Sequence, residues 1–280
     1  MTRELEAAGI EVVGLNDGLP GASSNLKHVD LLDRPLLHSA VKAIKPDLVL
    51  HLAAIAFVAH GDVDEIYRVN VVGTRNLLDA LAGLDDVPRR VVLASSANIY
   101  GNTDVDPIGE DVPAAPANDY AVSKLAMEYM ARIWSDRLPI VLARPFNYTG
   151  VGQSEQFLIP KIVGHFRRRE KVIELGNLAV ARDFGDVRDV AMAYRGLVQS
   201  ERAVGRVFNI CTGIGHTLGE VLAMMREIAG FDIEVRVNPA FVRANDVQRL
   251  VGSNAAISDV VDGTRARPLR ETLEWMYRQA

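Results

Sequence analysis

The chain has 280 residues, with 36 acidic and 31 basic side chains that give a formal net charge of −5 at pH 7. Because the two signs are interspersed, no nucleic-acid-binding surface is expected, and the arginine run 167–169 is too short to form one. A single cysteine, Cys211, excludes an internal disulfide and fits a reducing compartment. No apolar run approaches the roughly 20 residues of a membrane span, and no signal peptide is visible. A cytoplasmic protein with neither nucleic-acid nor membrane partners is therefore predicted.

Short apolar runs alternate with longer helical patterns through the first half of the chain. Such an alternation is typical of an α/β fold, in which a doubly wound parallel sheet carries helices on both faces. Strands are predicted over residues 10–15, 47–52, 90–95 and 139–144, and helices over residues 40–44, 63–84, 120–135 and 155–168.

The pattern changes after about residue 150, where the strands become short and the periodicity is mixed. We expect a main domain over residues 1–150 and a smaller mixed lobe over residues 151–280, with residues 187–215 returning to the main domain. Helices are predicted over residues 187–199, 218–229 and 269–278, and strands over residues 172–174, 206–210 and 232–237.

The start of the chain departs from the pattern of a Rossmann-type sheet. Residues 2–9 are predicted to be the end of a helix, with Gly9 at the C-terminal glycine position, and residues 10–15 follow as a strand. Such a sheet should begin one strand earlier, with a glycine-rich turn that leads into the helix. Neither G-x-x-G-x-x-G nor G-x-G-x-x-G precedes the helix here. Because the first strand is central, we expect a gap inside the sheet and a chain that begins late. The alternative is a rearranged sheet with impaired cofactor binding.

Tyr120 and Lys124, in the run 118–125, are the most informative pair of side chains. A phenol and an ammonium four residues apart on a helix project from the same face, one turn from each other. A positive charge beside a phenol lowers its pKa from about 10 toward the working range of a proton shuttle. The pair is therefore predicted to move a proton on and off a hydroxyl or carbonyl oxygen, although the same spacing also occurs on solvated helix faces.

Upstream of this pair, an apolar strand ends at Ser95 and Ser96. Ligands bind at the carboxyl ends of strands in α/β sheets, and a serine hydroxyl there can hydrogen-bond the reacting oxygen and orient it toward Tyr120. The alternative is that the two serines only cap the turn after the strand. The presence of the Tyr120 and Lys124 pair downstream favours the catalytic interpretation.

Six motifs in the same order along the chain point to one family. The chain resembles the extended short-chain dehydrogenases/reductases, in the branch that acts on nucleotide sugars, over essentially its whole length except the absent start. The motifs are His51-Leu52-Ala53-Ala54, Val69-Asn70-Val71-Val72-Gly73-Thr74, Ser95-Ser96-x-x-x-Tyr100-Gly101, Tyr120-x-x-x-Lys124, Arg144-Pro145-Phe146-Asn147 and Arg182-Asp183-Phe184-x-x-Val187-x-Asp189. This resemblance implies a Rossmann-type fold, NADP or NAD as the cofactor and a nucleotide sugar as the substrate. Residues 1–150 would bind the dinucleotide, and residues 151–280 would form mainly the substrate lobe.

The resemblance also implies a role for each matching residue. Ser96, four residues before Tyr100, would hold the substrate oxygen, Tyr120 would be the catalytic acid/base, and Lys124 would lower its pKa and bind the nicotinamide ribose. Asn70 would be mainly structural. The cofactor-binding set would be Asn16, Asp30, Leu52, Ala53, Ala54, Tyr120, Lys124 and Pro145, and the substrate-binding set Ser96, Asn147, Arg182, Arg243 and Asp246.

Within these sets, Asp30 would approach the adenine and Asn147 the diphosphate of the substrate. Arginine forks suit phosphate oxygens, so Arg182 and Arg243 would contact the diphosphate, with Asp246 on the nucleotide ribose. The alternative is that both arginines lie on the surface without a ligand.

The resemblance leaves dehydratase, epimerase and reductase open. The 4,6-dehydratases carry a carboxylate just after the catalytic Ser or Thr to remove a proton from C5, whereas Ala97 and Asn98 follow Ser96 here. Dehydration is therefore disfavoured. Residues 143–153 and 207–213 most resemble reductases that convert GDP-4-keto-6-deoxy-D-mannose to GDP-D-rhamnose, although those often have an acid at the position of Asn98. The second candidate is a 4-epimerase, which uses the same Ser, Tyr and Lys and keeps its NAD bound through both hydride transfers.

Particular residues bear on the choice of cofactor, on metal binding and on the oligomeric state. The neutral Asn16 ends the second expected strand, and no arginine follows it, so NAD and NADP both remain open. A cofactor-free binding protein is the third candidate, against which the intact catalytic set argues.

No metal site is predicted, because His51 and His60 lack a third ligand at suitable spacing, and Cys211 is expected to be packed in a strand. The partly apolar helices over 63–84 and 120–135 imply a homodimer, since such helices pair across a dimer in the family.

Overall fold

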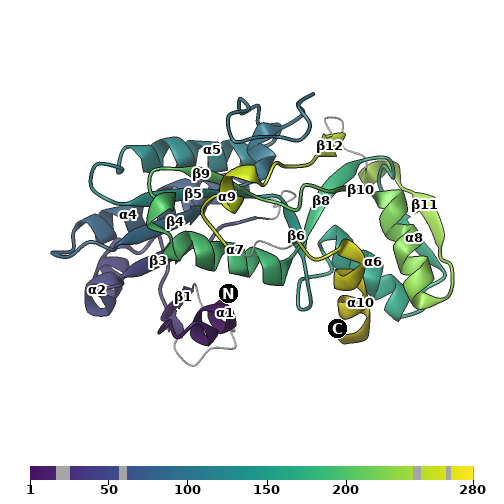
Figure 1. Cartoon of the computed structure of the whole chain (residues 1–280), viewed down its shortest axis with the longest axis horizontal. Helices are drawn as coiled ribbons and strands as arrows, with labels where there is room; N and C mark the ends of the chain where they lie inside the picture. Colours follow the sequence, from purple (N-terminus) through teal and green to yellow (C-terminus); the bar gives the residue numbers. More distant parts are fainter. Residues whose placement is uncertain (17–25, 57–61, 242–246, 263–265, 280) are drawn as a thin grey trace.

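The computed structural model describes residues 1–16, 26–56, 62–241, 247–262 and 266–279. Its main body is a sheet of four parallel strands in the order β3-β4-β5-β9, with helices on both faces (Figure 1). These strands are β3 (Leu48–His51), β4 (Arg90–Ala94), β5 (Ile140–Pro145) and β9 (Val207–Ile210). Strands β4 and β5 are almost completely buried, as continuous apolar runs in a doubly covered parallel sheet should be. The predicted α/β fold with a Rossmann-type sheet is confirmed.

Alternate side chains of β4 pack against two different helix layers. Val91 and Leu93 belong to the core beneath α2, α4 and α5, whereas Val92 belongs to the core beneath α7 on the opposite face. Helix α7 contacts β3, β4 and β5, and the next strand, β9, is hydrogen-bonded to β5. The chain therefore returns from the smaller lobe to the main sheet at α7. The helices named here are α2 (Arg34–Ile44), α4 (Thr74–Ala82), α5 (Asp119–Arg132) and α7 (Val187–Gln199).

The segment predicted as one helix over residues 63–84 has three parts, namely α3 (Val63–Tyr67), the π-helical turn η1 (Arg68–Gly73) and α4. Asn70 in η1 is buried, accepts a hydrogen bond from the backbone N–H of Ile55 (2.9 Å) and donates to the hydroxyl of Ser123 (3.0 Å). Asn70 thereby ties the loop after β3 to α5, which confirms its structural role. Single π-helical turns occur frequently at functional sites.

The N-terminal segment differs from the predicted strand pattern. After α1 (Thr2–Ala7), strand β1 covers only Gly14–Asn16 rather than residues 10–15. Ile10 and Val12 instead pack against the apolar core beneath α7. Their apolar character therefore reflects this packing and not a place in a strand. Strand β1 pairs in parallel with β2 (Leu26–His28) in a separate two-stranded sheet, as expected for a sheet with a gap.

The smaller lobe contains a sheet of short strands that the sequence analysis did not predict. Strand β8 (Ala181–Asp186) lies between β10 (Gly215–Thr217) and β12 (Arg249–Leu250), and it also pairs with β6 (Asn147–Thr149). Apart from β8, these strands have two or three residues, which is too short for the alternation that identifies a strand.

A second ribbon and three helices complete the lobe. Strand β7 (Val172–Leu175) pairs in parallel with β11 (Glu234–Val237). Helices α6 (Leu158–Arg167), α8 (Leu218–Ala229) and α10 (Leu269–Gln279) enclose an apolar core with this ribbon. These helices lie at the end of the molecule remote from α2 (Figure 1).

The predicted start of α2 at residue 40 is wrong, because the helix begins at Arg34. The Asp33 carboxylate accepts a hydrogen bond from the backbone N–H of Leu36 (3.0 Å) and Pro35 follows in the first turn, which are two strong start signals. Among the described residues, no helix has both the length and the apolar character needed to cross a membrane. The remaining short helices are η2 (Ala97–Tyr100), η3 (Glu201–Ala203), η4 (Pro239–Phe241) and α9 (Ala255–Ser258).

Candidate active site

A cavity of about 280 Å³ opens at the carboxyl ends of β3, β4 and β5, with further walls from α5 and α7. This is the edge at which open α/β sheets bind ligands. The cavity brings together the three candidate catalytic residues and part of both binding sets. The predicted residues in its walls are Leu52, Ala54, Ser96, Tyr120, Lys124, Pro145 and Asn147.

Ser96 directly follows β4 and lies in the cavity wall. Its Oγ accepts hydrogen bonds from the backbone N–H of Asn98 (3.2 Å) and from the Asn98 side-chain amide (3.3 Å). The turn closes at Gly101, which has φ +59°, and a Cβ at this position would clash with the carbonyl oxygen of Ala115. Ser96 therefore caps η2 and faces the cavity at the same time, so the two interpretations of this serine do not exclude each other.

Helix α5 places the tyrosine and the lysine on one buried face. It begins at Asp119 because the Asn118 side chain accepts a hydrogen bond from the backbone N–H of Ala121 (2.9 Å). Tyr120 then lies in the first turn and Lys124 in the second, with exposed fractions of 8% and 4%.

Burial raises the pKa of Tyr120 to about 12, a hydrogen bond with Ser96 opposes this rise, and Tyr148 adds to it. At neutral pH Tyr120 therefore holds its proton and can donate it to an oxygen bound beside Ser96.

Lys124 is engaged by the backbone of the sheet. Its Nζ donates a hydrogen bond to the carbonyl oxygen of Ala94 (2.8 Å), the last residue of β4. Burial lowers the pKa of Lys124 to about 8, against the opposing charge of Glu128. The expectation that Lys124 lowers the pKa of Tyr120 is wrong for this arrangement, since desolvation dominates the titration of the phenol.

A buried ion pair lies behind the cavity. Arg144 at the end of β5 donates two hydrogen bonds to the Glu128 carboxylate (2.9 and 2.7 Å), and both side chains are almost fully buried. Arg144 also donates to the hydroxyl of Tyr100 (2.9 Å), which donates to Asn209 on β9 (2.7 Å). Since Glu128 lies one turn after Lys124, this network fixes α5 against the sheet just beyond the lysine. Sequence reasoning missed Glu128, whose only signal was a carboxylate at helical spacing from Lys124.

Four further side chains of the cavity wall were missed by sequence reasoning: Tyr148, Gln153, Phe157 and Tyr194. Tyr148 and Gln153 fall within the run 143–153, so the motif itself could have drawn attention to them. Tyr194 comes from α7, and no local pattern shows that this helix returns to the site. Burial raises the pKa of both Tyr148 and Tyr194, so these phenols are also protonated at neutral pH.

Other predicted residues do not meet in this cavity, namely Asn16, Asp30, Ala53 and Arg182. The Asp30 carboxylate instead accepts a hydrogen bond from the backbone N–H of Leu32 (2.8 Å). Arg182 is half-buried on β8 in the smaller lobe. Two predicted substrate residues, Arg243 and Asp246, lie outside the described residues, as does His60.

His51 has the surroundings of a core residue. It ends β3, is 7% exposed and shares a hydrogen bond with the Thr74 hydroxyl (2.8 Å). Burial, followed by the nearby charge of Lys124, lowers the pKa of His51 to about 3. The imidazole is therefore neutral and packed at neutral pH.

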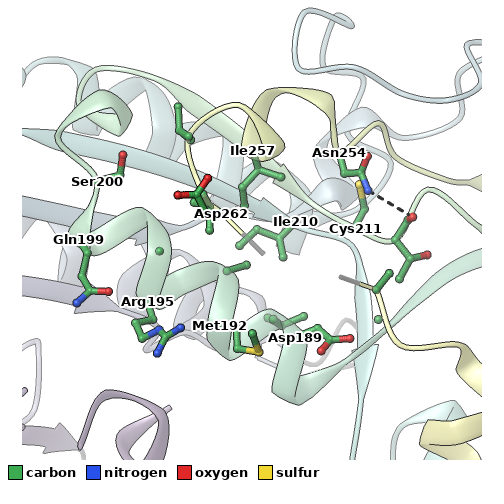
Figure 2. A pocket seen from close by; sticks show the side chains of 18 residues that line it. Asp189, Met192, Arg195, Gln199, Ser200, Ile210, Cys211, Asn254, Ile257 and Asp262 are labelled. Atoms are coloured by element: carbon green, nitrogen blue, oxygen red, sulfur yellow. Dashed lines mark hydrogen bonds between the residues drawn. The ribbon is translucent and has the colours of Figure 1, made fainter. Parts of the chain in front are cut away.

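A larger cavity of about 380 Å³ lies between α7, β9 and α9 (Figure 2). Asp189 and Arg195 project from α7 beside it, while Ile210 and Cys211 lie on the opposite wall. Burial raises the pKa of the Cys211 thiol well above its usual range, so this thiol is not an activated nucleophile. None of the candidate catalytic residues lines this cavity, which is therefore not the candidate active site.

One polar atom in the wall of the smaller cavity is consistent with a bound cofactor. The Ser95 Oγ is buried and has no hydrogen-bond partner among the described residues. A buried hydroxyl without a partner costs on the order of 1–3 kcal/mol, and a polar ligand that reaches it removes this cost. With the apolar walls of Leu52, Ala54 and Pro145 and the amine of Lys124 in the same cavity, the residues fit a flat ring joined to a sugar, as in nicotinamide riboside.

The sequence matches a protein family and two named enzymes. Residues 9–276 match the family described as GDP-mannose 4,6 dehydratase. The chain is 34% identical over 251 residues to the GDP-6-deoxy-D-talose 4-dehydrogenase of Aggregatibacter actinomycetemcomitans, which covers 89% of this chain and 85% of that protein. It is also 34% identical over 225 residues to the GDP-6-deoxy-D-mannose reductase of Pseudomonas aeruginosa, which covers 76% of this chain and 73% of that protein.

Solved structures show the same fold over nearly the whole chain. A presumed epimerase from Burkholderia cenocepacia J2315 is 50% identical, with a TM-score of 0.92, and the match covers 99% of this chain and 91% of that chain. The protein RMD from Pseudomonas aeruginosa, solved in complex with NADPH, is 29% identical with a TM-score of 0.81, covering 92% of this chain and 89% of that chain.

Proposed function

Because the chain belongs to the GDP-mannose 4,6-dehydratase family of extended short-chain dehydrogenases/reductases, we propose that it reduces GDP-4-keto-6-deoxy-D-mannose at C4 to GDP-D-rhamnose. The observation that carries this proposal is the buried, protonated Tyr120 beside Ser96 at the carboxyl end of β4. The relatives confirm the coarser prediction of an NAD(P)-dependent enzyme that modifies nucleotide sugars. The cofactor-free binding protein is therefore no longer a candidate.

In this mechanism Ser96 and Tyr120 act on the C4 carbonyl. A bound nicotinamide cofactor supplies the hydride for C4. Ser96 donates a hydrogen bond to the keto oxygen, and Tyr120 transfers its phenolic proton to that oxygen as the hydroxyl forms. The ammonium of Lys124, which donates a hydrogen bond to the Ala94 carbonyl at the end of β4, is assigned to the nicotinamide ribose. Solvent then returns a proton to Tyr120.

The remaining roles follow the division of the chain. We assign the dinucleotide to residues 1–150 and mainly the sugar nucleotide to residues 151–280, with residues 187–215 in the main domain. On the cofactor side we place Lys124 with Asn16, Asp30, Leu52, Ala53, Ala54 and Pro145. On the substrate side we place Ser96 with Asn147, Arg182, Arg243 and Asp246.

A nucleotide-sugar 4-epimerase is the second candidate, and the 50% identity to the presumed epimerase favours it. The product of a reductase is a separate question from the type of reaction. Reduction of the keto sugar at C4 gives either rhamnose or 6-deoxytalose, which differ only in the configuration at C4. The relative named for 6-deoxy-D-talose matches more of the chain than the relative named for 6-deoxy-D-mannose, which favours testing both products.

The proposal is tested by incubating the chain with GDP-4-keto-6-deoxy-D-mannose and either NADPH or NADH. We expect one equivalent of reduced cofactor to be consumed per sugar, with GDP-D-rhamnose as the product in the NMR spectrum. Formation of GDP-6-deoxy-D-talose would keep the reductase and correct the product. Interconversion of C4-epimeric UDP-hexoses without net cofactor consumption, and no reduction of the keto sugar, would replace the proposal with the epimerase.

We also propose that the protein is a homodimer that pairs through α5 and the neighbouring α3–α4 segment. An apolar stripe at helical spacing runs along α5 and its C-terminal cap, formed by Val122, Ala126, Tyr129 and Ile133. Tyr129 is 61% exposed and Ile133 is 79% exposed. An apolar stripe of this kind normally faces a core or a partner, and the resemblance implies that the partner is a second copy.

Ile133→Asp is expected to convert the dimer to a monomer, because it places a carboxylate in the most exposed part of the apolar stripe, where an unpaired charge in the paired surface is costly. Light scattering during size-exclusion chromatography at micromolar concentration measures the mass. Ile214→Asp is the matched control, since Ile214 is also exposed but lies in the turn before β10. A wild-type chain that is already monomeric would contradict the proposal.

A further inference from the structure

Among the hydrogen bonds of the described residues, both of those that the Ser96 Oγ accepts come from Asn98. It is half-buried in η2 and lies in the wall of the same cavity as Ser96. Both its backbone N–H and its side-chain amide point at the Ser96 Oγ, at 3.2 and 3.3 Å. The backbone contact is the ordinary cap of η2, whereas the side-chain contact is an addition that the cap does not require.

The two contacts determine what the serine hydroxyl can do. A hydroxyl has one donor hydrogen and two acceptor lone pairs. When Asn98 occupies both acceptor positions, the hydrogen of Ser96 points to a third direction. The hydrogen bond with Ser96 opposes the rise in the pKa of Tyr120, so this direction is toward the phenol and the space beside it. Ser96 is thereby held as a donor to an oxygen bound next to Tyr120.

We propose that Asn98 is a positioning residue, whose amide fixes Ser96 as the hydrogen-bond donor to the keto oxygen of the sugar. This inference rests on the proposed role of Ser96 in reduction. An ionised carboxylate at position 98 cannot make this side-chain contact, because it only accepts hydrogen bonds. Asn98 therefore acts through Ser96 and is not expected to hold the substrate itself.

The test is a double-mutant cycle on kcat and KM for the keto sugar, with Ser96→Ala, Asn98→Ala, Asn98→Asp and the two combinations. We expect Asn98→Ala and Asn98→Asp each to lower kcat about tenfold, because both remove the amide donor, and KM to change less than about threefold. In the Ser96→Ala background neither change at position 98 should lower kcat further, because residues that act through one group are not additive. Asn177→Ala is the control, since its side chain accepts a hydrogen bond from the backbone N–H of Ala179 in the β7–β8 turn, in the smaller lobe.

The outcomes separate this inference from the proposed function. If Ser96→Ala keeps near-normal turnover, the proposed role of Ser96 fails and this inference fails with it. If Ser96→Ala is impaired but the Asn98 variants have normal kcat, or if the losses add, only the positioning role is overturned. A raised KM with unchanged kcat would also overturn it, because Asn98 would then bind the substrate directly. Melting temperature and NADPH binding of each variant show that the site is folded.

Discussion

Tyr120→Phe is expected to lower kcat for the keto sugar by about 10²–10⁴-fold, which is the range that a positioned general acid contributes. The phenylalanine ring fills the same buried volume and loses only the hydroxyl that bonds Ser96. The binding of NADPH, followed by its fluorescence, and the melting temperature should stay close to those of the wild type. The loss should therefore appear in kcat and in kcat/KM by the same factor, as for an interaction made in the transition state.

Two other tyrosines provide controls for this result. Tyr129 lies on the same helix but is 61% exposed, so the Tyr129→Phe variant should have an unchanged kcat. Tyr148→Phe removes the second phenol in the wall of the cavity. If Tyr148→Phe were the inactive variant and Tyr120→Phe the active one, the proton donor would be Tyr148 and the assignment from the sequence motif would be incorrect.

The strands of the main sheet could be predicted because the sequence of each strand alone shows that it is buried. β4 and β5 are continuous apolar runs covered on both faces, and such runs leave few alternatives for folding. The segment with Ile10 and Val12 is also apolar, yet it packs against the core beneath α7 without joining a strand. Strand β8 was missed because its pairing depends on partners far along the chain, such as β12, which no local pattern contains.

The candidate site shows the same difference between features that a local motif reveals and features that depend on tertiary packing. Ser96, Tyr120 and Lys124 could be identified because motif spacing is a property of the sequence. The direction of the Tyr120 pKa could not, since it depends on burial by elements that pack from other parts of the chain. Tyr194 and Glu128 were missed for the same reason, because their importance arises only when α7 and β5 reach the site.

Lys124→Met is expected to lower kcat by at least about 10²-fold and, at the same time, to raise the melting temperature at pH 7. The buried ammonium has a pKa of about 8 in the folded protein, against 10.5 for the ordinary side chain. This difference corresponds to roughly 3 kcal/mol of unfavourable free energy below pH 8. The loss of the hydrogen bond to Ala94 offsets about 1–2 kcal/mol of the gain. The net increase of roughly 1–2 kcal/mol corresponds to a melting temperature higher by about 2–8 °C.

The pH dependence identifies the cause of this stabilisation. Between pH 8 and pH 10.5 the unfolded chain binds more protons at Lys124 than the folded chain, so the unfolding free energy of the wild type rises with pH in this window. The methionine variant lacks this titration, and its advantage in melting temperature should therefore be largest at pH 7 and shrink toward pH 10. Lys161→Met is the control, because that half-buried lysine also bonds a backbone oxygen, that of Glu174, and should show little change at either pH. An advantage that is equal at pH 7 and pH 10 would mean that better packing of methionine is responsible. A lower melting temperature at pH 7 would mean that the hydrogen bond to β4 outweighs the desolvation of the charge.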